Sequence, residues 1–364
     1  MRFPEFSGEW EETTLGKISE ITKGCGISKD QLSEQGSPCI LYGELYTKYK
    51  AEIIDEVYSR TELDSSALVK SKVNDVIIPC SGETAIDIST ARCVPHDNIL
   101  LGGDLNIIRL KHDDGGFFAY QLNGARKKDI ARVAQGVSVV HLYGENLKQI
   151  RVYHPNIEEQ KKITRLLSLI DERIATQNKI IEKYESLIKG IAQSIAHSNK
   201  SNVRIFECLE CSSSTLQENK VFEFGYYPVY GANGIVGYLD NYNTQSEAIY
   251  IIKDGSGVGT VSYVTGKCSA TGTLSILQAK EGYSLQYFYY LLKVFNFEPY
   301  KTGMAIPHIY FKDYGKAKIF CPSYSEQLRY AKLLSAIDDK LLAEQKILTN
   351  FGFQKQYLLC QMFI

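Results

Sequence analysis

Two stretches of this chain nearly repeat each other: Pro155-Asn-Ile-Glu-Glu-Gln-Lys-Lys-Ile-Thr-Arg-Leu-Leu-Ser-Leu-Ile-Asp171 and Pro322-Ser-Tyr-Ser-Glu-Gln-Leu-Arg-Tyr-Ala-Lys-Leu-Leu-Ser-Ala-Ile-Asp338. They lie 167 residues apart (322 − 155). The same offset aligns Gly136-Val-Ser-Val-Val-His141-Leu-Tyr143 with Gly303-Met-Ala-Ile-Pro-His308-Ile-Tyr310. So many identities in one frame indicate an internal duplication, and a repeat of this length predicts two copies of one structural unit.

Each copy contains the signals for the start of a helix. A strand-like run, at 150–153 and at 317–320, ends at a proline, which cannot donate to a β-ladder and disfavours helix in the residue before it. The pairs Asn156-x-x-Glu159 and Ser323-x-x-Glu326 then follow. In a capping box the Asn or Ser oxygen accepts an amide of the first turn, and the Glu side chain reaches back to the amide of the cap residue. The sequence therefore predicts a capping box and a helix start in each copy.

The predicted helices carry a long stripe with alternating steps of four and three residues, which is typical of a coiled-coil seam. The seam positions are Ile163, Leu167, Ile170, Ile174, Gln177, Ile181, Tyr184, Ile188, Ile191 and Ile195, and then Tyr330, Leu334, Ile337, Leu341, Glu344, Leu348, Phe351, Lys355, Leu358 and Met362. We interpret them as two long helices that pair with each other. The alternative is two amphipathic helices, each packed only on its own domain. If the helices pair antiparallel, Gln177 and Glu344 should meet where they cross.

The rest of each copy consists of short β-branched and aromatic runs broken by Gly, Asn and Asp, which predicts β-rich domains with a few short helices. We expect a first domain at 1–155, a first helix at 156–197, a second domain at 198–322 and a second helix at 323–364. The polar stretch at 198–202 is the expected linker. The predicted fold class is α+β, with two such domains separated by two long antiparallel helices in a pseudo-two-fold duplication.

The overall charge argues against indiscriminate DNA binding. The 41 basic and 42 acidic residues give a net charge of −1, whereas a non-specific binder usually carries a strong basic excess. The nine cysteines follow no disulfide-framework spacing. Cys208 and Cys211 have the spacing of half a zinc site, but no second pair or nearby histidine follows them. Because no apolar run is long enough for a signal peptide or a membrane span, we expect a cytoplasmic protein.

The sequence shows no motif for a catalytic site. It lacks the G-x-x-x-x-G-K-[ST] phosphate loop and the H-E-x-x-H metal pair. Two glycine-rich segments, 231–237 and 255–259, resemble phosphate-binding loops only loosely, and the second lies between two strand-like runs where a dinucleotide site needs a helix. We interpret both segments as tight turns, and His141 and His308 as structural members of the repeat.

What remains is a recognition surface. Basic residues gather at 126–128 and Arg132 in the first domain and at Lys301, Lys312, Lys316 and Lys318 in the second, although an ordinary solvated face explains them equally well. Loops of small polar and aromatic residues suit hydrogen bonds to bases and phosphates. The predicted DNA-contact residues are Tyr42, Glu44, Ser81, Glu83, Thr84, Lys127 and Lys128 in the first domain, and Tyr230, Asn233, Ser256 and Thr271 in the second.

Over essentially its whole length the chain resembles the specificity subunits of type I restriction–modification systems. The resemblance rests on Pro155-x-x-Glu-Glu-Gln160 and Pro322-x-x-Ser-Glu-Gln327, each continuing into Leu-Leu-Ser-x-Ile-Asp. It also rests on Tyr42-Gly-Glu-Leu-Tyr46, Ser81-Gly-Glu-Thr84 and Tyr227-Pro-Val-Tyr-Gly-Ala-Asn-Gly234. Within the repeat Val140 and Pro307 differ, and the tail from Gly352 loses its heptad regularity.

The resemblance implies a non-catalytic subunit whose two domains each read one half of an asymmetric, bipartite DNA site. The helices would act as a spacer and as docking surface for two modification (methyltransferase) subunits. Those subunits would bring S-adenosylmethionine for adenine methylation, and restriction (translocase and nuclease) subunits would bring ATP and magnesium for cleavage. The resemblance implies no cofactor or metal on this chain. A two-headed adaptor that binds proteins, and an enzyme with an unrecognised site, are the alternatives that the sequence leaves open.

Overall fold

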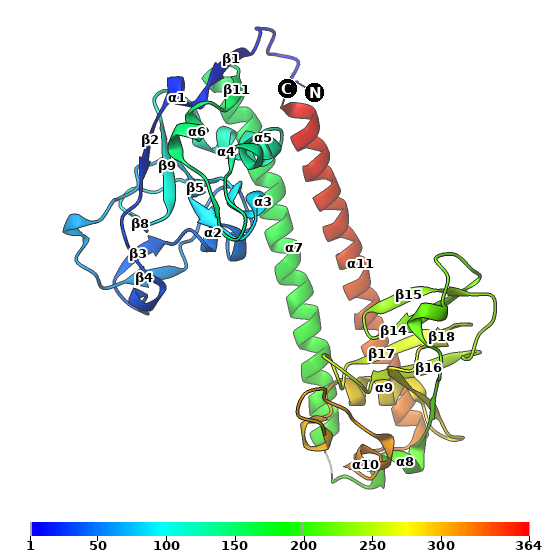
Figure 1. The fold of residues 1–364 in the computed structure, drawn as a ribbon. Helices are drawn as coiled ribbons and strands as arrows, with labels where there is room; N and C mark the ends of the chain where they lie inside the picture. The colour runs from blue at the N-terminus through cyan, green and yellow to red at the C-terminus, as the bar shows by residue number, and fades with distance from the viewer. Residues whose placement is uncertain (1, 199, 364) are drawn as a thin grey trace. The chain divides into compact units, whose positions relative to one another are not determined.

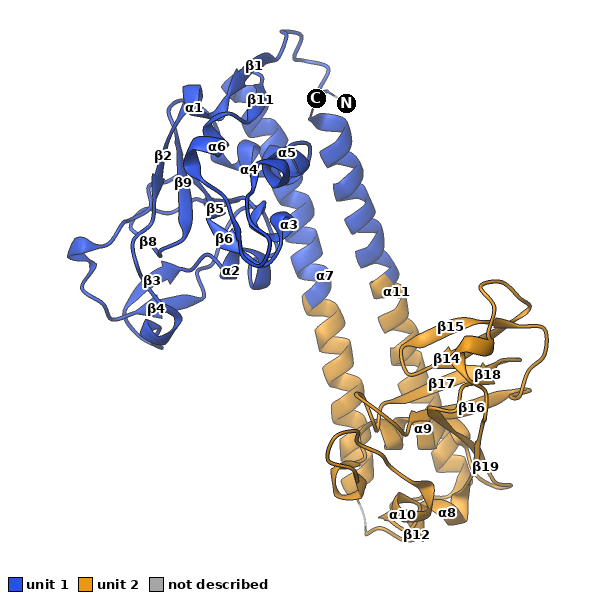
Figure 2. Ribbon diagram, viewed as in Figure 1, with its two compact units in different colours: residues 1–178, 346–364 blue, residues 179–345 orange. Residues whose placement is uncertain are grey.

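The computed structural model describes residues 2–198 and 200–363 (Figure 1). They form two compact units: the first unit comprises residues 1–178 and 346–364, and the second unit residues 179–345 (Figure 2). Two long helices, α7 (Ile157–His197) and α11 (Tyr324–Met362), contribute to both units. Asn199, in the expected linker, lies outside the described residues.

The β-rich part of the first unit is built from short strands, short α-helices and 3-10 helices (η). In chain order these are β1 (Glu11–Thr14), α1 (Leu15–Ile18), β2 (Ser19–Lys23), η1 (Lys29–Gln31), β3 (Ser37–Ile40), α2 (Glu44–Thr47), β4 (Ser59–Thr61), η2 (Ser65–Ala67), β5 (Asp75–Pro79), β6 (Ser81–Gly82), α3 (Ala85–Ile88), β7 (Arg92–Val94), β8 (Leu100–Leu101), β9 (Leu105–Leu110), α4 (Gly115–Asn123), α5 (Lys127–Val133), β10 (Val140–His141), α6 (Gly144–Lys148) and β11 (Arg151–His154).

The β-rich part of the second unit follows a similar order. Its elements are β12 (Val203–Arg204), α8 (Ile205–Cys208), β13 (Leu209–Ser213), η3 (Glu218–Lys220), β14 (Tyr227–Gly231), β15 (Gly234–Leu239), β16 (Glu247–Ile252), β17 (Val261–Thr265), β18 (Ser269–Ala270), β19 (Leu274–Ala279), α9 (Leu285–Lys293), η4 (Glu298–Tyr300), α10 (Phe311–Tyr314) and β20 (Lys318–Ile319).

Each unit has its own set of sheets, and the strand orders of the two sets match. The first unit has a four-stranded sheet in the order β2-β9-β5-β7, a three-stranded sheet β4-β3-β8 and a strand pair β1-β11. The second unit has the corresponding β13-β19-β16-β17, β15-β14-β18 and β12-β20. In each three-stranded sheet one pair, β3-β8 or β14-β18, is parallel. This match confirms the duplication and the α+β fold class predicted from the sequence.

Each unit has its core where the four-stranded sheet meets a short apolar helix. In the first unit β5 is buried along its whole length, and α4 contributes Phe117 and Phe118 to the same core. In the second unit β16 is buried from Ala248 to Ile252, and α9 packs against it. Strands buried on both faces read as continuous apolar runs rather than as alternation. The core therefore fixes where the loops at the sheet ends emerge.

The glutamine of the repeated Pro-x-x-x-Glu-Gln stretch joins each β-rich part to its long helix. The Gln160 side chain accepts from the backbone N–H of Asp114 at 2.9 Å and donates to the carbonyl of the proline that opens the stretch at 2.9 Å. Gln327 does the same, with the N–H of Ser284 at 2.9 Å and its proline carbonyl at 3.0 Å. Asp114 and Ser284 are the N-cap residues of α4 and α9. The duplicated motif is therefore a buried hydrogen-bonded clamp, which explains why Pro and Gln recur together.

The two predicted capping boxes have different outcomes. In the second copy the carboxylate of Glu326 accepts from the N–H of Ser323 at 3.1 Å, which is one half of the predicted box, and the Ser323 hydroxyl donates to the same carboxylate at 2.6 Å. In the first copy Asn156 does accept from the N–H of Glu159 at 3.0 Å, but the Glu159 side chain does not reach back. It accepts two hydrogen bonds from the guanidinium of Arg2, at 2.7 and 2.6 Å. A bidentate charged pair is stronger than a bond to a neutral amide, so the full box predicted there is wrong.

The seam predicted for the long helices is confirmed, because every one of its positions is buried or half-buried. In the first unit Asp171 of α7 contacts Lys355 of α11, and in the second unit Ile188 and Leu341 line one pocket. An early part of α7 thus meets a late part of α11, and the reverse, so the helices run antiparallel in each unit. Gln177 is buried and Glu344 half-buried. Their contact stays a prediction.

A buried polar cluster explains the irregular end of the seam. The hydroxyl of Tyr120 donates to Asp171 at 2.7 Å, and the corresponding Tyr290 donates to Asp338 at 3.0 Å. The first unit adds a lysine to its cluster, since Lys355 contacts Asp171 at 2.6 Å and Glu52 at 2.5 Å. Lys355, the charged residue in the irregular end of the seam, is therefore paired with two buried acids of the first unit.

We expect Tyr120→Phe to destabilise the first unit more than Tyr290→Phe destabilises the second. Tyr120 is fully buried, and its loss removes a donor from a buried carboxylate, which costs about 1–3 kcal/mol. Asp338 is only half-buried, so water can replace the lost donor. Thermal unfolding of both variants, with proteolysis to report which unit opens first, measures the difference. Equal losses would contradict this reading of the two clusters.

Candidate nucleic-acid interface

Tyr42 and Glu44 line a pocket of about 480 Å³ in the first unit, together with Ser28, Lys29 and Lys48. The Glu44 carboxylate is buried and already occupied. It accepts from the N–H of Leu41 at 3.0 Å and from the Lys48 ammonium at 2.6 Å. Glu44 therefore shapes the wall of this pocket, while Tyr42 and the lysines supply the groups that a ligand could contact.

The loop that contains Ser81, Glu83 and Thr84 is fixed by its own side chains. Ser81 is buried and donates to Asp104 at 3.2 Å. Thr84 caps α3, since its hydroxyl oxygen accepts from the N–H of Asp87 at 3.1 Å. Glu83 and Thr84 are exposed. The Thr84 hydroxyl also donates to the Asp87 carboxylate at 2.6 Å, so the loop offers the carboxylate of Glu83 at the surface on a rigid base.

Helix α5, which packs against α3, adds the basic residues of the first unit. Lys128 is exposed, and Lys127 is half-buried. Burial, with a smaller contribution from Arg92, lowers the pKa of Lys127. Because α3 and α5 are in contact, the predicted residues at 81–84 and 127–128 do come together in one surface region.

The second unit brings Tyr230 and Thr271 together. The N–H of Thr271 donates to the carbonyl of Tyr230 at 2.9 Å. Thr271 is buried, and its hydroxyl contacts that of Thr273 at 2.8 Å. Tyr230 packs edge-on against Tyr250, and burial raises the pKa of the Tyr230 phenol. Asn233 is exposed in the turn that joins β14 to β15, so it is free of the packing that holds the other two.

Ser256 lies exposed in the turn between β16 and β17, which is the tight turn expected from the sequence. The glycines on either side, Gly255 and Gly257, have φ angles of 93° and 105°. Residues other than glycine rarely adopt this backbone conformation. The turn borders His308, which contacts Asp254 at 2.6 Å.

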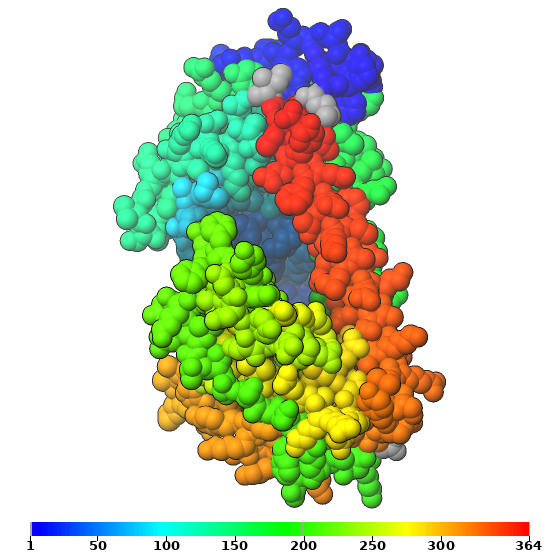
Figure 3. Space-filling view, turned by 90° about the vertical axis from the view of Figure 1, so that its right-hand side faces the viewer, coloured from blue at the N-terminus to red at the C-terminus, as the bar shows by residue number. Residues whose placement is uncertain are grey.

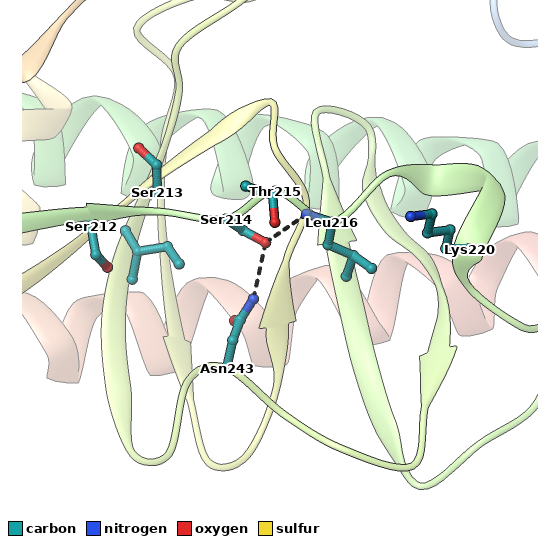
Figure 4. Close-up of a pocket in the computed structure, with 8 residues that line it drawn as sticks. Ser212, Ser213, Ser214, Thr215, Leu216, Lys220 and Asn243 are labelled. Atoms are coloured by element: carbon teal, nitrogen blue, oxygen red, sulfur yellow. Dashed lines mark hydrogen bonds between the residues drawn. The ribbon is translucent and has the colours of Figure 1, made fainter.

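A hydroxyl-lined pocket of about 520 Å³ in the second unit escaped the sequence analysis. Its lining residues are Ser212, Ser213, Ser214, Thr215, Leu216, Lys220, Asn243 and Ile276 (Figure 4). Ser214 accepts from the N–H of Leu216 at 3.0 Å and from the amide of Asn243 at 3.2 Å (Figure 4). This pocket lies beside the end of β13 and η3, whereas the first-unit pocket lies between η1 and the segment after β3. The run of four hydroxyl residues, which begins in the last two residues of β13 and continues into the following loop, was the available signal.

Exposed aromatic residues also escaped the sequence analysis. Phe222, Phe224 and Tyr226 are all exposed on the loop before β14. Nearby, the ammonium of Lys267 lies 4.9 Å from the ring centre of Tyr242. Aromatic faces of this kind can stack on nucleic-acid bases. The sequence analysis singled out small polar residues in the loops and so passed over them.

The structure also bears on metal binding, on the C-x-x-C pair and on membrane insertion. Within residues 2–198 and 200–363 no group of three or more His, Cys, Asp and Glu side chains is arranged to hold a metal ion. Cys208 of the C-x-x-C pair lies against Cys321, and this contact and burial raise the pKa of the Cys208 thiol. In the part of the chain that the structure describes, no helix is both long and apolar enough to cross a membrane.

Comparison with protein families gives a match that falls on both copies of the repeat. The family described as type I restriction modification DNA specificity domain matches residues 7–186 and again residues 203–350. Together the two matches cover most of the chain, and each one takes in the β-rich part of one copy with much of its long helix.

Individual relatives and solved structures agree with the family match. A protein described as a type I specificity subunit, from Mycoplasma pneumoniae, is 23% identical over 360 residues, which cover 92% of this chain and 91% of that one. The specificity subunit of the type I restriction enzyme EcoprrI of Escherichia coli is 27% identical over 112 residues, 31% of this chain and 28% of that one. The crystal structure of a type I S subunit from M. genitalium superposes with a TM-score of 0.68 at 19% identity, covering 100% of this chain and 99% of that one.

Proposed function

The chain belongs to the type I restriction–modification DNA specificity family, a non-catalytic family, and from that premise we propose that it recognises an asymmetric, bipartite DNA site. Each unit reads one half of that site. The observation that carries this proposal is a shared framework with different surfaces. On this framework the first unit has a pocket lined by Tyr42 and lysines beside η1 and the segment after β3, and the second unit has a pocket lined by serines and Asn243 beside β13 and η3. Two different surfaces on one framework suit two different half-sites.

The predicted contact residues divide into two roles within this proposal. Exposed residues such as Glu83, Lys128 and Asn233 can reach bases or phosphates directly. Buried ones, such as Glu44, Ser81 and Thr271, hold the loops in place. The division follows from burial, because a side chain whose polar atoms are already paired inside the protein cannot exchange those partners for DNA at low cost.

We extend the proposal to partner subunits. A solved structure that is described as the basis of complex assembly of the type I R-M system superposes on this chain with a TM-score of 0.56 at 16% identity. In this chain the C-terminal part of α11 reaches the surface (red in Figure 3), and Phe353 and Tyr357 in that part are exposed. Two modification subunits would dock on the helices, bind S-adenosylmethionine and methylate adenine. Restriction subunits would use ATP and magnesium to translocate and cleave DNA. This assembly would act in the cytoplasm. Its partner subunits would supply the basic surface for the DNA backbone that a chain of near-neutral charge lacks.

A domain exchange tests whether each unit recognises its own half of the DNA site. Replacing residues 1–155 with the corresponding part of a relative should change one half of the methylated motif and leave the other half intact. The reciprocal replacement of residues 198–322 should change only the other half. Methylome sequencing of cells that carry each hybrid with the modification subunit measures both outcomes. A change in both halves from one exchange would argue against independent units, and an adaptor that binds only protein would direct no methylation at all.

A further inference from the structure

Each unit carries one short loop that is held at its base in the same way. In the first unit Gln135 and His141 exchange backbone hydrogen bonds of 2.9 and 2.7 Å. In the second unit Thr302 and His308 do the same at 2.9 and 2.7 Å. The loops between these pairs, residues 136–140 and 303–307, are here called the first finger and the second finger.

A glycine at the start of each finger fixes its shape. Gly136 has a φ of 122° and Gly303 a φ of 89°, values that favour glycine. A Cβ atom would lie 2.1 Å from the carbonyl oxygen of Val139 in the first finger and 2.3 Å from that of Ile306 in the second. Behind each finger a histidine stacks on a tyrosine, with ring centres 6.3 Å apart in the first unit and 6.4 Å in the second. The fingers are therefore rigid and equivalent.

The tip of each finger presents apolar side chains to water. Val137 is 98% exposed and Met304 is fully exposed. Two residues further on, Val139 is 52% exposed and Ile306 57% exposed. The residue types differ, but their position and exposure are the same in both units. The two copies of the repeat keep apolar side chains uncovered at this position although the residue types have diverged, which indicates a binding partner that covers them.

The surroundings of the fingers favour DNA as that partner. Helix α5, with Lys127 and Lys128, ends two residues before the base of the first finger. The first finger pairs with β6 at Gly82, next to the polar loop at 83–84. The second finger accepts from the N–H of Gly255, beside Ser256, at its Pro307 carbonyl, at 3.0 Å. Each finger thus projects from the surface that we propose reads DNA.

The size of the fingers argues against a protein partner. A stable protein interface buries about 800 Å² on each side, far more than two small apolar tips can provide. A single apolar side chain is, however, enough to wedge a DNA base step, and proteins use Met, Ile and Pro for this purpose. Unstacking depends on deformability rather than on base-edge contacts, so two units that read different sequences could both use it.

We propose that the two fingers are apolar wedges that enter the base stack of DNA, Val137 in one half-site and Met304 in the other. This proposal rests on the proposed function, because it assigns a finger to each half-site. It adds local distortion of the duplex at two defined steps. The recognition surfaces then select the sequence, and the fingers open the stack next to it.

The test uses the chain assembled with its modification subunit, on a duplex that contains the motif found by methylome sequencing. The fluorescent base 2-aminopurine, which brightens when it is unstacked, is placed at each step in turn. Wild-type complex should brighten one step in each half-site. Val137→Ser should remove the signal in one half-site only, Met304→Ser in the other only, and each should weaken binding about tenfold. Val73→Ser, at a residue that is 55% exposed elsewhere in the first unit, should keep both signals.

Four results would overturn the proposal. Both finger variants could retain the fluorescence and the affinity of the wild type. They could lose assembly with the modification subunit in the absence of DNA, which would make the fingers a protein-docking element. Replacing thymine with deoxyuridine could reproduce the loss, which would mean contact with thymine methyl groups instead of wedging. If the wild-type complex retains no specific DNA at all, the proposed function fails first, and this result is distinct from a defect of the finger variants alone.

Discussion

Replacing Lys355 with methionine should destabilise the first unit by about 3–5 kcal/mol, the cost of removing one partner from a buried ion pair. The Lys355 ammonium contacts Glu52 at 2.5 Å and Asp171 at 2.6 Å, and the side chains of both acids are only 8% exposed. Methionine fills a similar volume but leaves two buried carboxylates without their cation. Thermal unfolding should show a clear fall in the midpoint, while Lys346→Met, at an exposed position of the same helix, should leave it nearly unchanged.

The pH dependence of the Lys355→Met variant has a defined sign. Burial already raises the pKa of Glu52 in the native protein, and loss of the lysine, which opposes this rise, should raise it further. A raised native pKa means that folding favours the protonated acid, so the cost is absent below the unfolded pKa of about 4.3, grows as the pH rises from there to the native pKa, and is constant above it. The defect should therefore be largest at neutral pH and shrink on acidification. Adding Glu52→Gln to Lys355→Met should recover part of the loss. A defect that is independent of pH would show that lost packing, not charge, is responsible.

The parts of the fold that could be predicted from the sequence are those encoded over short distances. The seam of α7 and α11 follows from a spacing of three and four residues, and the cap at Ser323 from two residues three apart. The parts that escaped depend on distant partners. Glu159 meets Arg2, 157 residues away, and Lys355 meets Glu52, 303 residues away. No local pattern predicts such pairs, so the sequence showed only that the tail from Gly352 loses its heptad regularity and not that Lys355 at a seam position is paired with Glu52.

The candidate interface shows a similar limit. The sequence identified loops of suitable composition, but composition does not tell which side chains point inward. Thr84 is exposed, whereas Ser81, three residues earlier, is buried against Asp104. The finger tips were missed because Val137 and Met304 are apolar residue types that are usually assigned to a core, although both are exposed here. In the structure a glycine turn that occurs in both copies keeps these two side chains exposed to solvent.

Inserting four residues into both long helices should lengthen the unspecified gap of the DNA motif by about two base pairs. The insertions belong at equivalent positions, after Ile181 in α7 and after Leu348 in α11. Four helical residues add about 6 Å, which is close to two base-pair steps. Matched insertions move the seam of both helices together, so the pairing within each unit is disturbed least. Methylation at the original spacing should fall to background, and methylome sequencing should reveal the longer motif.

The matched control for this insertion places the same four residues after Lys200, in the segment between α7 and β12. That change lengthens the chain without lengthening either helix, so the gap should stay as in the wild type. An insertion in α7 alone should be worse than the double insertion, because it shifts one side of the seam against the other and brings polar residues to seam positions. If the double insertion retained methylation with an unchanged gap, the helices would not set the distance between the half-sites, and the spacing would have to be fixed by the partner subunits instead.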